Sequence, residues 1–418
     1  MAQTVDLSLA TRANNLQAVP TLVEDINTLS KSLESDDENV RHELFLKARS
    51  LVQSLQTPRE LMLQHTWADP GLNAALISCV DIGLWKLMVK NGVDTSQKVD
   101  DLSRALEVDP VLLGSPLDAT HLCHRHLKET GQDEYKLTNF SKSLSLDVIS
   151  DGYLALLGGI GRSPIEFYKF LRETKWQNPM DATRTAMHTS YTTNQPNCFE
   201  YLRSVGLGPQ TNHHMGGYRQ GRLTWMHPSI YPVEKTLFPG ADDSPDAPLV
   251  VDVAGGLGHD INEFKKFYPN HPGKLILQDL PVVINDVKGI DPSIKLMGHD
   301  FLTEQPIKGA RAYFMHSIMH DWPDDVCQKI LAPLAQAMKP GYSKLLIFEC
   351  VIPKTGAYWE ATAGDILMMT QLSAVERTED HWHQLIEGSG LNLKIFKFWK
   401  CGQSDVENLI ECELTQDA

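Results

Sequence analysis

The stretch Leu249-Val-Val-Asp-Val-Ala-Gly-Gly-Leu-Gly-His-Asp260 decides the fold of this chain. Apolar residues lead into Asp252, small residues follow it, and a helix-like run then extends from Ile261 to Phe267. This order predicts a buried strand, a tight turn and a helix, in which a ligand can lie against the backbone N–H groups at the start of the helix. The acid ahead of the turn suits a ligand with an ammonium group better than it suits a diphosphate.

Two later runs repeat the pattern of an apolar segment that ends in an acid. Lys274-Leu-Ile-Leu-Gln-Asp-Leu-Pro281 ends its apolar part at Asp279, which is placed to accept hydrogen bonds from both hydroxyls of a ribose. Ile294-Lys-Leu-Met-Gly-His-Asp-Phe301 closes with an acid and an aromatic ring, which suit the amine and the face of an adenine. Three strand ends that each suit one part of an adenosine indicate this ligand more specifically than any one strand end does alone.

These runs, together with Met319-His-Asp-Trp-Pro-Asp-Asp325, resemble the S-adenosylmethionine-dependent O-methyltransferases of fungal secondary metabolism, which are related to the plant caffeic acid type. The similarity extends from about Pro70 to the end of the chain. It implies an α/β fold, in which a Rossmann-like domain that binds S-adenosylmethionine follows an N-terminal helical, winged-helix-like dimerisation domain. It also implies a homodimeric, metal-independent enzyme that methylates a hydroxyl of an aromatic or polyketide-derived small molecule.

The His-Asp-Trp segment is the candidate catalytic element, because it follows the fourth predicted strand of the sheet. An imidazole beside a carboxylate is suited to removing a proton from a phenol or an enol near neutral pH. The resemblance implies that His320 is the general base, that Asp321 lies next to it in the pocket wall, and that Trp322 flanks the cofactor. The alternative is that the segment caps the following helix, and both roles are compatible.

Two further carboxylates match the family pattern. Glu349 ends the run Leu345-Leu-Ile-Phe-Glu349, and Glu376 lies in Val375-Glu-Arg-Thr-Glu379. In the plant relatives, acids at these places orient and polarise the catalytic histidine, so the resemblance implies the same role here. The alternative readings are a surface acid at a strand end for the first and the start of a helix for the second.

The predicted cofactor contacts come from the ends of the strands and the turns that follow them. His316 stands where the family commonly has Arg or Lys, and Ala254 stands where it usually has glycine. The full predicted cofactor-binding set is Asp252, Gly255, Gly256, Gly258, Asp279, Leu280, Asp300, Phe301, His316 and Trp322.

Three other functions are compatible with parts of the sequence. Some fungal proteins of this fold bind S-adenosylmethionine and catalyse dehydration or pericyclic ring closure of polyketide–pyridone intermediates, but in them the His of His-Asp-Trp is replaced, whereas His320 is retained here. A non-enzymatic binding protein with a degenerate domain is disfavoured by the intact Asp279, Asp300 and His320. An NAD-dependent dehydrogenase ranks last, because Ala-Gly-Gly-Leu-Gly does not follow the GxGxxG spacing.

Composition limits the partners and the compartment. The 418 residues carry a formal net charge of −15, which argues against nucleic acid or an anionic membrane as a general partner. The 7 cysteines form no CxxC pair, as expected for free thiols in a reducing compartment. The first thirty residues do not resemble a signal peptide, and no apolar run approaches the length of a membrane span. We therefore expect a cytoplasmic protein.

The chain divides into four predicted regions. Residues 1–65 form a helical dimerisation segment that exchanges between subunits, and residues 66–150 form the winged-helix-like dimerisation domain. Residues 151–240 are a helical connection around the substrate, and residues 241–418 are the Rossmann-like catalytic domain.

Two histidines of the cluster His121, His124 and His126 could share a helix face, but no further ligand completes a set, so we predict no metal.

The connection is rich in aromatic residues, which suit the roof over a planar or polyketide-like substrate as well as ordinary helix packing. The side chains predicted to contact the substrate are His188, Thr192, Met215, Trp225 and Met369.

The catalytic domain alternates strands with helices, which predicts a doubly wound sheet with ligands at the carboxyl ends of its strands. The resemblance implies that the last two strands form an antiparallel hairpin. The predicted strands are Leu249–Val253, Lys274–Gln278, Ile294–Met297, Ala310–Met315, Ser343–Cys350, Leu391–Trp399 and Glu407–Thr415.

Overall fold

The computed structural model describes residues 5–33, 37–115, 126–218, 221–401 and 406–415. The chain forms two compact units, Met1–Leu146 and Asp147–Ala418. In the described residues, no single helix is both long enough and apolar enough to cross a membrane, although the bent pair Pro58–Asp81 and Leu84–Asn91 reaches that length and composition together.

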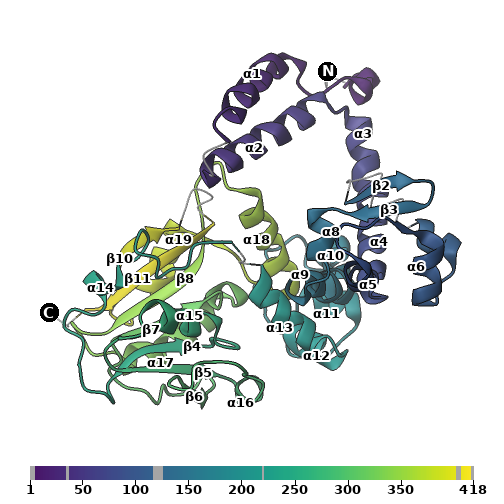
Figure 1. Cartoon of the computed structure of the whole chain (residues 1–418). Helices are drawn as coiled ribbons and strands as arrows, with labels where there is room; N and C mark the ends of the chain where they lie inside the picture. The colour runs from purple at the N-terminus through teal and green to yellow at the C-terminus, as the bar shows by residue number, and fades with distance from the viewer. Residues whose placement is uncertain (1–4, 34–36, 116–125, 219–220, 402–405, 416–418) are drawn as a thin grey trace. The chain divides into compact units, whose positions relative to one another are not determined.

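The first unit is mostly helical. Helices α1 and α2 pack against each other (Figure 1), and both are amphipathic. Thr57 and Glu60 form a reciprocal capping box that starts α3. The helices of this unit are α1 (Val19–Ser30), α2 (Glu38–Leu55), α3 (Pro58–Leu63), α4 (Asp69–Asp81), α5 (Leu84–Asn91), α6 (Val99–Leu106) and α8 (Asn139–Ser143), with short turns η1 (Leu7–Thr11), η2 (Leu16–Ala18) and η4 (Gln64–Ala68).

A small antiparallel sheet completes the first unit. Its order is β1-β3-β2, formed by Gln97–Lys98, Glu134–Leu137 and Leu127–Gly131. The central strand, β3, pairs antiparallel with both of its neighbours. Residues 110–115 are helical, and residues 116–125 lie outside the described part of the chain.

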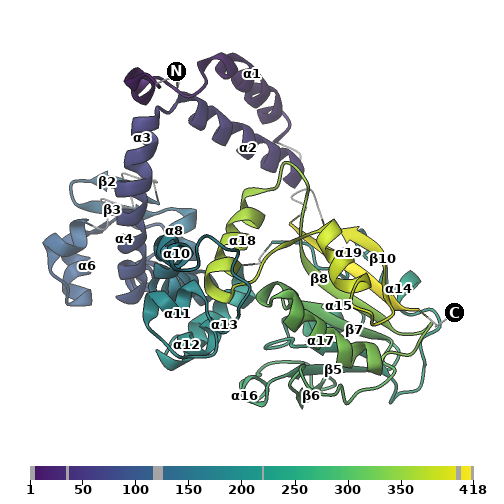
Figure 2. The ribbon, with the colours of Figure 1, turned by 180° about the vertical axis from the view of Figure 1, so that it is seen from behind.

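The second unit begins with a group of helices, of which α10 and α11 pack against α18 (Figure 2). Thr185 caps α11 through a side-chain bond to the N–H of His188, and Asn197 caps α12 in the same way. These helices are α9 (Asp147–Gly152), η5 (Tyr153–Ile160), α10 (Arg162–Glu173), α11 (Ala186–Tyr191), α12 (Cys198–Ser204), α13 (Gly208–Gly217), α14 (Val233–Thr236) and α18 (Trp359–Leu372).

The sheet of the second unit has the order β10-β11-β8-β7-β4-β5-β6, with β9 pairing to the end of β8. The strands from β8 to β6 are parallel, whereas β10 and β11 form an antiparallel hairpin at one edge, as expected. The strands are β4 (Pro248–Val253), β5 (Lys274–Asp279), β6 (Lys295–Gly298), β7 (Ala312–His316), β8 (Lys344–Ile352), β9 (Arg377–Thr378), β10 (Leu393–Lys400) and β11 (Glu407–Leu414).

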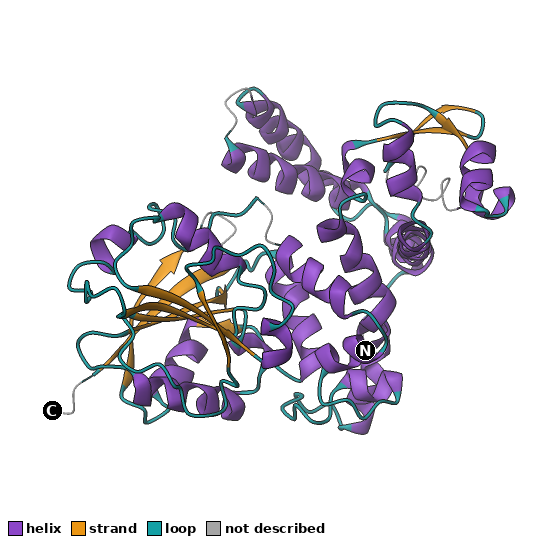
Figure 3. Ribbon diagram, turned by 60° about the horizontal axis from the view of Figure 1, so that its bottom comes forward, coloured by secondary structure: helices purple, strands orange, loops and turns teal. Residues whose placement is uncertain are grey.

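Helices cover both faces of this sheet (Figure 3). On one face, Val251 and Tyr313 pack with apolar residues of α17 and α19. On the other, Val250 and Phe314 pack with Phe264 of α15. The alternation of side chains along each strand places consecutive residues in opposite layers. The helices and turns that belong to the sheet are α15 (His259–Phe267), α16 (Pro281–Ile284), η6 (Met319–Asp321), α17 (Asp324–Ala337) and α19 (Glu379–Glu387).

Candidate active site

The turn after β4 allows the chain to pass close to the strand ends. An ideal Cβ on Gly255 would lie 2.4 Å from Cγ of Asp252 and 2.6 Å from Cδ1 of Leu277, so only glycine fits there. Gly258, the residue before α15, has φ 80°, a left-handed conformation that favours glycine. Ala254 also adopts a left-handed conformation, with φ 59°, at the position where the family usually has glycine.

Asp252 is a buried carboxyl group with an unused oxygen. Its side chain is 1% exposed, and Oδ2 has no hydrogen-bond partner in the described part of the chain. Burial raises the pKa of Asp252 well above its ordinary value, and the nearby acids Asp260 and Asp279 raise it further while His316 opposes them. A positively charged ligand group at this oxygen would satisfy it, which fits the ammonium group of S-adenosylmethionine.

Asp279 ends β5 and faces the same turn. Its Oδ2 accepts a hydrogen bond from the N–H of Gly256 at 2.8 Å, and its Oδ1 accepts one from the N–H of Leu280 at 2.7 Å. Burial raises the pKa of Asp279, and the two N–H groups partly offset this effect. The carboxylate is thus fixed in orientation at the strand end, where a ribose contact is predicted.

The predicted adenine contacts meet beyond β6. The Phe301 ring meets the Trp322 ring edge to face, with centroids 6.2 Å apart. Asp300 and Leu280 are exposed, and Oδ1 of Asp300 accepts a hydrogen bond from the N–H of Leu302 at 2.9 Å. The structure therefore brings an acid and two aromatic rings together from β6 and the turn after β7.

His316, at the end of β7, lies between two acids. Its Nδ1 is 2.7 Å from Oδ2 of Asp260, and its Nε2 is 3.4 Å from Oε1 of Glu407. Arg222 forms ion pairs with Glu407, at 3.5 Å, and with Glu360. Where the family commonly has an Arg or Lys, this chain thus has an imidazole enclosed by carboxylates. Sequence reasoning missed these two contacts of His316, because Asp260 and Glu407 lie 56 and 91 positions away in the chain.

His320 lies in η6 among three carboxylates. Its Nδ1 is 2.8 Å from Oε1 of Glu376 and 3.9 Å from Oε2 of Glu349, and its Nε2 is 3.6 Å from Oδ1 of Asp321. The N–H of Glu376 donates to Asp365 at 2.9 Å, which fixes the backbone that carries this acid. The structure therefore brings together all four of the residues predicted to be catalytic.

The charges of this cluster determine its protonation. Burial alone would lower the pKa of His320, but Glu349, Glu376 and Asp321 outweigh burial and raise it well above its ordinary value. Burial raises the pKa of Asp321 to about 7, with His320 opposing this shift. Burial also raises the pKa of Glu349, whose Oε2 has no hydrogen-bond partner in the described residues. The surrounding carboxylates therefore favour the protonated form of the His320 imidazole.

The same three side chains have the ligand types of a metal site. One atom each from His320, Glu349 and Glu376 lies within 4.8 Å of the others. The hydrogen bond between His320 and Glu376 already satisfies two of these atoms, and the absence of a metal stays a prediction. In the histidine cluster of the first unit, His121 and His124 lie outside the described residues, and the His126 ring packs 4.3 Å from the Phe140 ring.

The predicted substrate residues lie in different environments. His188 is tied into its own loop, because its ring nitrogens lie 2.9 Å from Thr185 Oγ1 and 2.8 Å from the carbonyl oxygen of Gln195. Trp225 is buried in the core and stacks on Phe314, with ring centroids 4.7 Å apart. Thr192 and Met215 are exposed, and Met369 is half-buried on α18. Their contact with a substrate stays a prediction, and core packing already explains the burial of Trp225.

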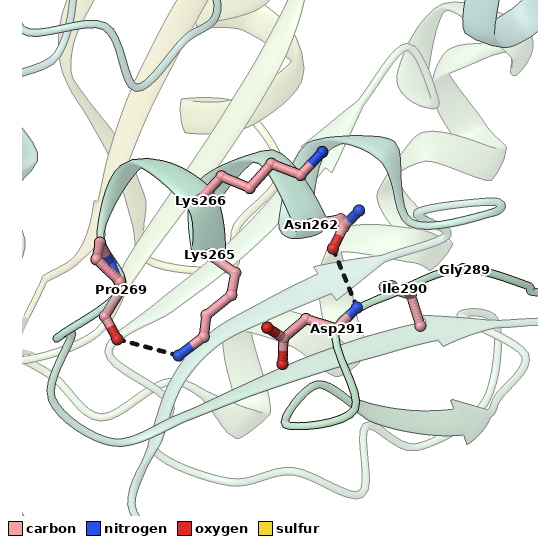
Figure 4. A pocket seen from close by; sticks show the side chains of 7 residues that line it. All are labelled: Asn262, Lys265, Lys266, Pro269, Gly289, Ile290 and Asp291. Carbon is pink, nitrogen blue, oxygen red and sulfur yellow. Dashed lines mark hydrogen bonds between the residues drawn. The ribbon is translucent and has the colours of Figure 1, made fainter.

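A hollow of about 440 Å³ lies away from the strand ends, between α15 and the loop at Gly289 to Asp291. Figure 4 shows that Lys266 points away from Lys265, whose ammonium group donates to the carbonyl oxygen of Pro269 at 3.0 Å. Asn262 accepts a hydrogen bond from the N–H of Asp291 at 3.1 Å. The side chains of this hollow thus hold the loop rather than converge on a ligand.

Comparison with known proteins identifies relatives along nearly the whole chain. The O-methyltransferase domain family matches residues 242–392. O-methyltransferase mfmE of Annulohypoxylon moriforme is 34% identical over 94% of this chain and 96% of its own length. O-methyltransferase penC of Penicillium thymicola is 30% identical over 93% of this chain and 96% of its own length.

Solved structures show the same fold. The structure of LepI in complex with SAM has a TM-score of 0.84 and 26% identity, and covers 95% of this chain and 99% of that one. A structure described as a pericyclic reaction enzyme has a TM-score of 0.84 and 27% identity, and covers 96% of this chain and 100% of that one. The structure of OxaC in complex with sinefungin and meleagrin has a TM-score of 0.82 and 24% identity, and covers 95% of this chain and 99% of that one. At this identity the likeness concerns the fold alone.

Proposed function

The chain belongs to the S-adenosylmethionine-dependent O-methyltransferases, and from this premise we propose that it methylates a hydroxyl of an aromatic or polyketide-derived secondary metabolite, with His320 as the general base. The observation that carries the proposal is the contact between His320 and Glu376, 2.8 Å apart. An imidazole fixed by a carboxylate through Nδ1 keeps its Nε2 for the proton of an acceptor hydroxyl.

The glycine turn and the strand ends are the proposed cofactor site. Gly256 has open space beside its backbone for a ligand, and Gly255 and Gly258 let the turn pass close to Leu277. Asp252 offers its unpartnered oxygen to a cationic group. Asp279 is proposed to bind the ribose. Asp300, Phe301, Leu280, His316 and Trp322 complete the proposed set.

When bound, S-adenosylmethionine supplies an activated methyl group. The protein then needs to align the acceptor oxygen and accept its proton. His320 takes this proton, and Glu376 stabilises the imidazolium that forms. Glu349 adds a second negative charge to the same ring, although its Oε1 is occupied by two backbone N–H groups. Asp321 lies beside Nε2, with its Oδ1 3.6 Å away.

A second candidate function has its own support. The solved structures that resemble this chain include the one described as a pericyclic reaction enzyme, at 27% identity. The raised pKa of His320 means that the resting imidazole carries a proton, and a protonated imidazole can act as an acid. Dehydration or ring closure of a polyketide-derived substrate without methyl transfer is therefore the alternative.

Radiolabelled methyl transfer distinguishes the two functions. The native chain is incubated with S-adenosylmethionine carrying a labelled methyl group and a panel of phenols and pyridone polyketides, alongside His320→Ala. His383→Gln is the matched control, because His383 is a half-buried histidine that is also paired with a glutamate, Glu387. We expect label in the product of the native and control proteins and none with His320→Ala. An unlabelled isomer or dehydrated product from the native protein would refute methyl transfer and establish the alternative.

A further inference from the structure

The short turn that carries His320 is held from two sides by residues distant in the chain. At its beginning, the N–H groups of Ile318 and Met319 both donate to Oε1 of Glu349, each at 2.7 Å. On its other side lies Arg377, the first residue of β9, whose side chain has no exposed surface. The backbone donors are thus held by one buried side chain and the backbone acceptors by another.

Arg377 binds the two carbonyl groups that flank His320 and Asp321. Its Nη1 donates to the carbonyl oxygen of Met319 at 2.8 Å, and its Nη2 donates to that of Trp322 at 2.8 Å. A guanidinium group is planar and its donors are fixed relative to one another. Two bonds from one rigid group to both ends of η6 therefore restrict rotation of this turn.

A buried arginine requires compensation for its lost hydration, and Asp324 provides it. Nε and Nη2 of Arg377 donate to Oδ1 of Asp324 at 3.0 and 2.8 Å. Nε2 of His381 lies 2.7 Å from the other oxygen, Oδ2. Burial alone would raise the pKa of Asp324, but the bonds to His381 and Arg377 outweigh it and lower the pKa, so the group stays ionised. The Trp382 ring covers the guanidinium, 5.4 Å from its centre.

Arg377 also follows Glu376 directly in the chain. The same piece of backbone therefore places the carboxylate on Nδ1 of His320 and the guanidinium on the carbonyls of the turn that carries His320. Movement of this backbone would therefore displace both the carboxylate that contacts the imidazole and the guanidinium that holds the turn.

We propose that Arg377, held by Asp324, is a positioning residue that fixes the His320 imidazole against Glu376. The kinetic test of this inference rests on the proposed function, because it measures the rate of methyl transfer. Arg377 does not face the reaction itself, because its donors are occupied by Met319, Trp322, Asp324 and the sulfur of Cys327.

The test compares two buried arginines that both bind backbone carbonyls. Arg377→Lys keeps the positive charge and loses the planar fork. Arg311→Lys is the matched control, since Arg311 is also buried and donates to the carbonyl oxygens of Leu237 and Pro239, each at 2.8 Å, beside the start of β7 rather than at its carboxyl end. A merely structural role predicts the same consequences for both variants.

For Arg377→Lys we expect kcat to fall by about 10- to 100-fold, because small displacements of a catalytic group are that costly, with an unchanged KM for S-adenosylmethionine. Arg311→Lys is expected to keep the native kcat at temperatures below its melting transition. If Arg377→Lys does not fold, Asp324→Asn replaces it in the same comparison. An equal loss of kcat in both arginine variants, or native kcat in Arg377→Lys, would overturn the proposal.

A second readout does not depend on activity. The charged groups that face His320 are Asp321 from η6, Glu349 from β8 and Glu376 ahead of β9. Histidine labelled at Cε1 reports the titration of His320 by NMR, assigned with His320→Gln. We expect the pKa of His320 to fall in Arg377→Lys, because a looser turn weakens the contact with Glu376, and to stay native in Arg311→Lys. An unshifted titration in Arg377→Lys refutes the positioning role even if the native protein transfers no methyl group.

Discussion

His320 is surrounded by more negative charge than a single catalytic base requires. Glu376 lies 2.8 Å from its Nδ1, Glu349 lies 3.9 Å from the same atom, and Asp321 lies beside Nε2. These carboxylates stabilise the imidazolium form, so they strengthen the base and at the same time retain its proton. The pH of the medium then decides how many molecules carry an imidazole that is ready to accept a proton.

We predict that the pH–rate profile of methyl transfer has an ascending limb, along which kcat rises with pH, and that the midpoint of this limb lies above pH 6.5. The sign follows from the raised pKa of His320, because the base becomes active only as pH increases through that pKa. Glu376→Gln removes one stabilising charge, so the limb should shift to lower pH while kcat falls by about 10- to 100-fold. Steady-state methyl transfer between pH 5 and 10 measures both effects.

The control for this substitution is Glu379→Gln, which changes an exposed glutamate in the first turn of α19. It should leave the limb and kcat unchanged. A limb that does not move in Glu376→Gln would mean that Glu376 does not set the proton affinity of His320.

Asp252 leads to a prediction about cofactor binding. Asp252→Asn should weaken binding of S-adenosylmethionine by about 10- to 100-fold, because a charged partner for a cationic group is lost. Since the pKa of Asp252 is raised, affinity in the native protein should increase with pH as this carboxyl ionises, and binding should release protons. Isothermal titration calorimetry in buffers of different ionisation enthalpy measures both quantities.

Asp286→Asn, which changes an exposed acid beyond α16, should leave cofactor affinity native. Tight binding by Asp252→Asn at every pH would show that the unpartnered oxygen does not meet the cofactor's charge.

The sequence was informative about side chains that carry chemistry and uninformative about those that support them. The resemblance pointed to His320, Glu349 and Glu376, and the structure brings them together. Arg377 could not be found in this way, because its partners at Met319 and Trp322 are backbone carbonyls, which every residue has. A signal was nevertheless present: a charged residue directly beside a predicted catalytic acid.

At the scale of elements, the turn after β4 combines close packing with a left-handed alanine. Alanine at φ 59° costs about 1–2 kcal/mol relative to its preferred conformations. We therefore predict that Ala254→Gly stabilises the protein by about 1 kcal/mol, which corresponds to a rise in Tm of about 2–4 °C for a unit of this size. Differential scanning calorimetry without cofactor measures the change.

Ala335→Gly is the opposite control, because Ala335 is a buried residue in the last turn of α17 and its backbone is helical. It should lower Tm, since glycine costs about 1 kcal/mol within a helix and a buried methyl group is lost as well. If Ala254→Gly lowers Tm by as much, then the alanine methyl group contributes packing that outweighs the backbone cost.

The strands of the sheet were predictable because each has a dense apolar run. The predicted runs from Leu249–Val253 to Glu407–Thr415 all correspond to strands, with ends that differ by up to two residues. The order of strands was less accessible, because β11 inserts between β10 and β8 through pairings distant in sequence. The two-residue strand β9 was not predicted at all, since two residues carry no periodicity.

At the scale of the whole molecule, the first unit leaves apolar side chains on α1 and α2 exposed, including Val23, Leu46 and Val52. Exposed apolar patches of this kind mark interaction sites. We predict that the chain is a homodimer and that Leu46→Glu combined with Val52→Glu shifts it to monomer. Analytical ultracentrifugation across a range of concentrations measures the mass.

Phe396→Glu serves as the control, because Phe396 is an exposed apolar residue of β10 in the second unit. It should leave the mass native. A native chain that sediments as a monomer at every concentration would rule out dimerisation, and with it any exchange of helices between subunits.

The adjacency of Glu376 and Arg377 limits how this enzyme can evolve. One side chain contacts the imidazole and the next binds the backbone beneath it. Deletion of one residue from the preceding segment, Ser373 to Val375, would place Arg377 beside His320 and Thr378 at the two carbonyl oxygens, whereas insertion of one residue would place Glu376 at those carbonyl oxygens and Val375 beside His320. Such a change would abolish the base and its support in one step. Loop length here should therefore be far less tolerant of variation than loop composition.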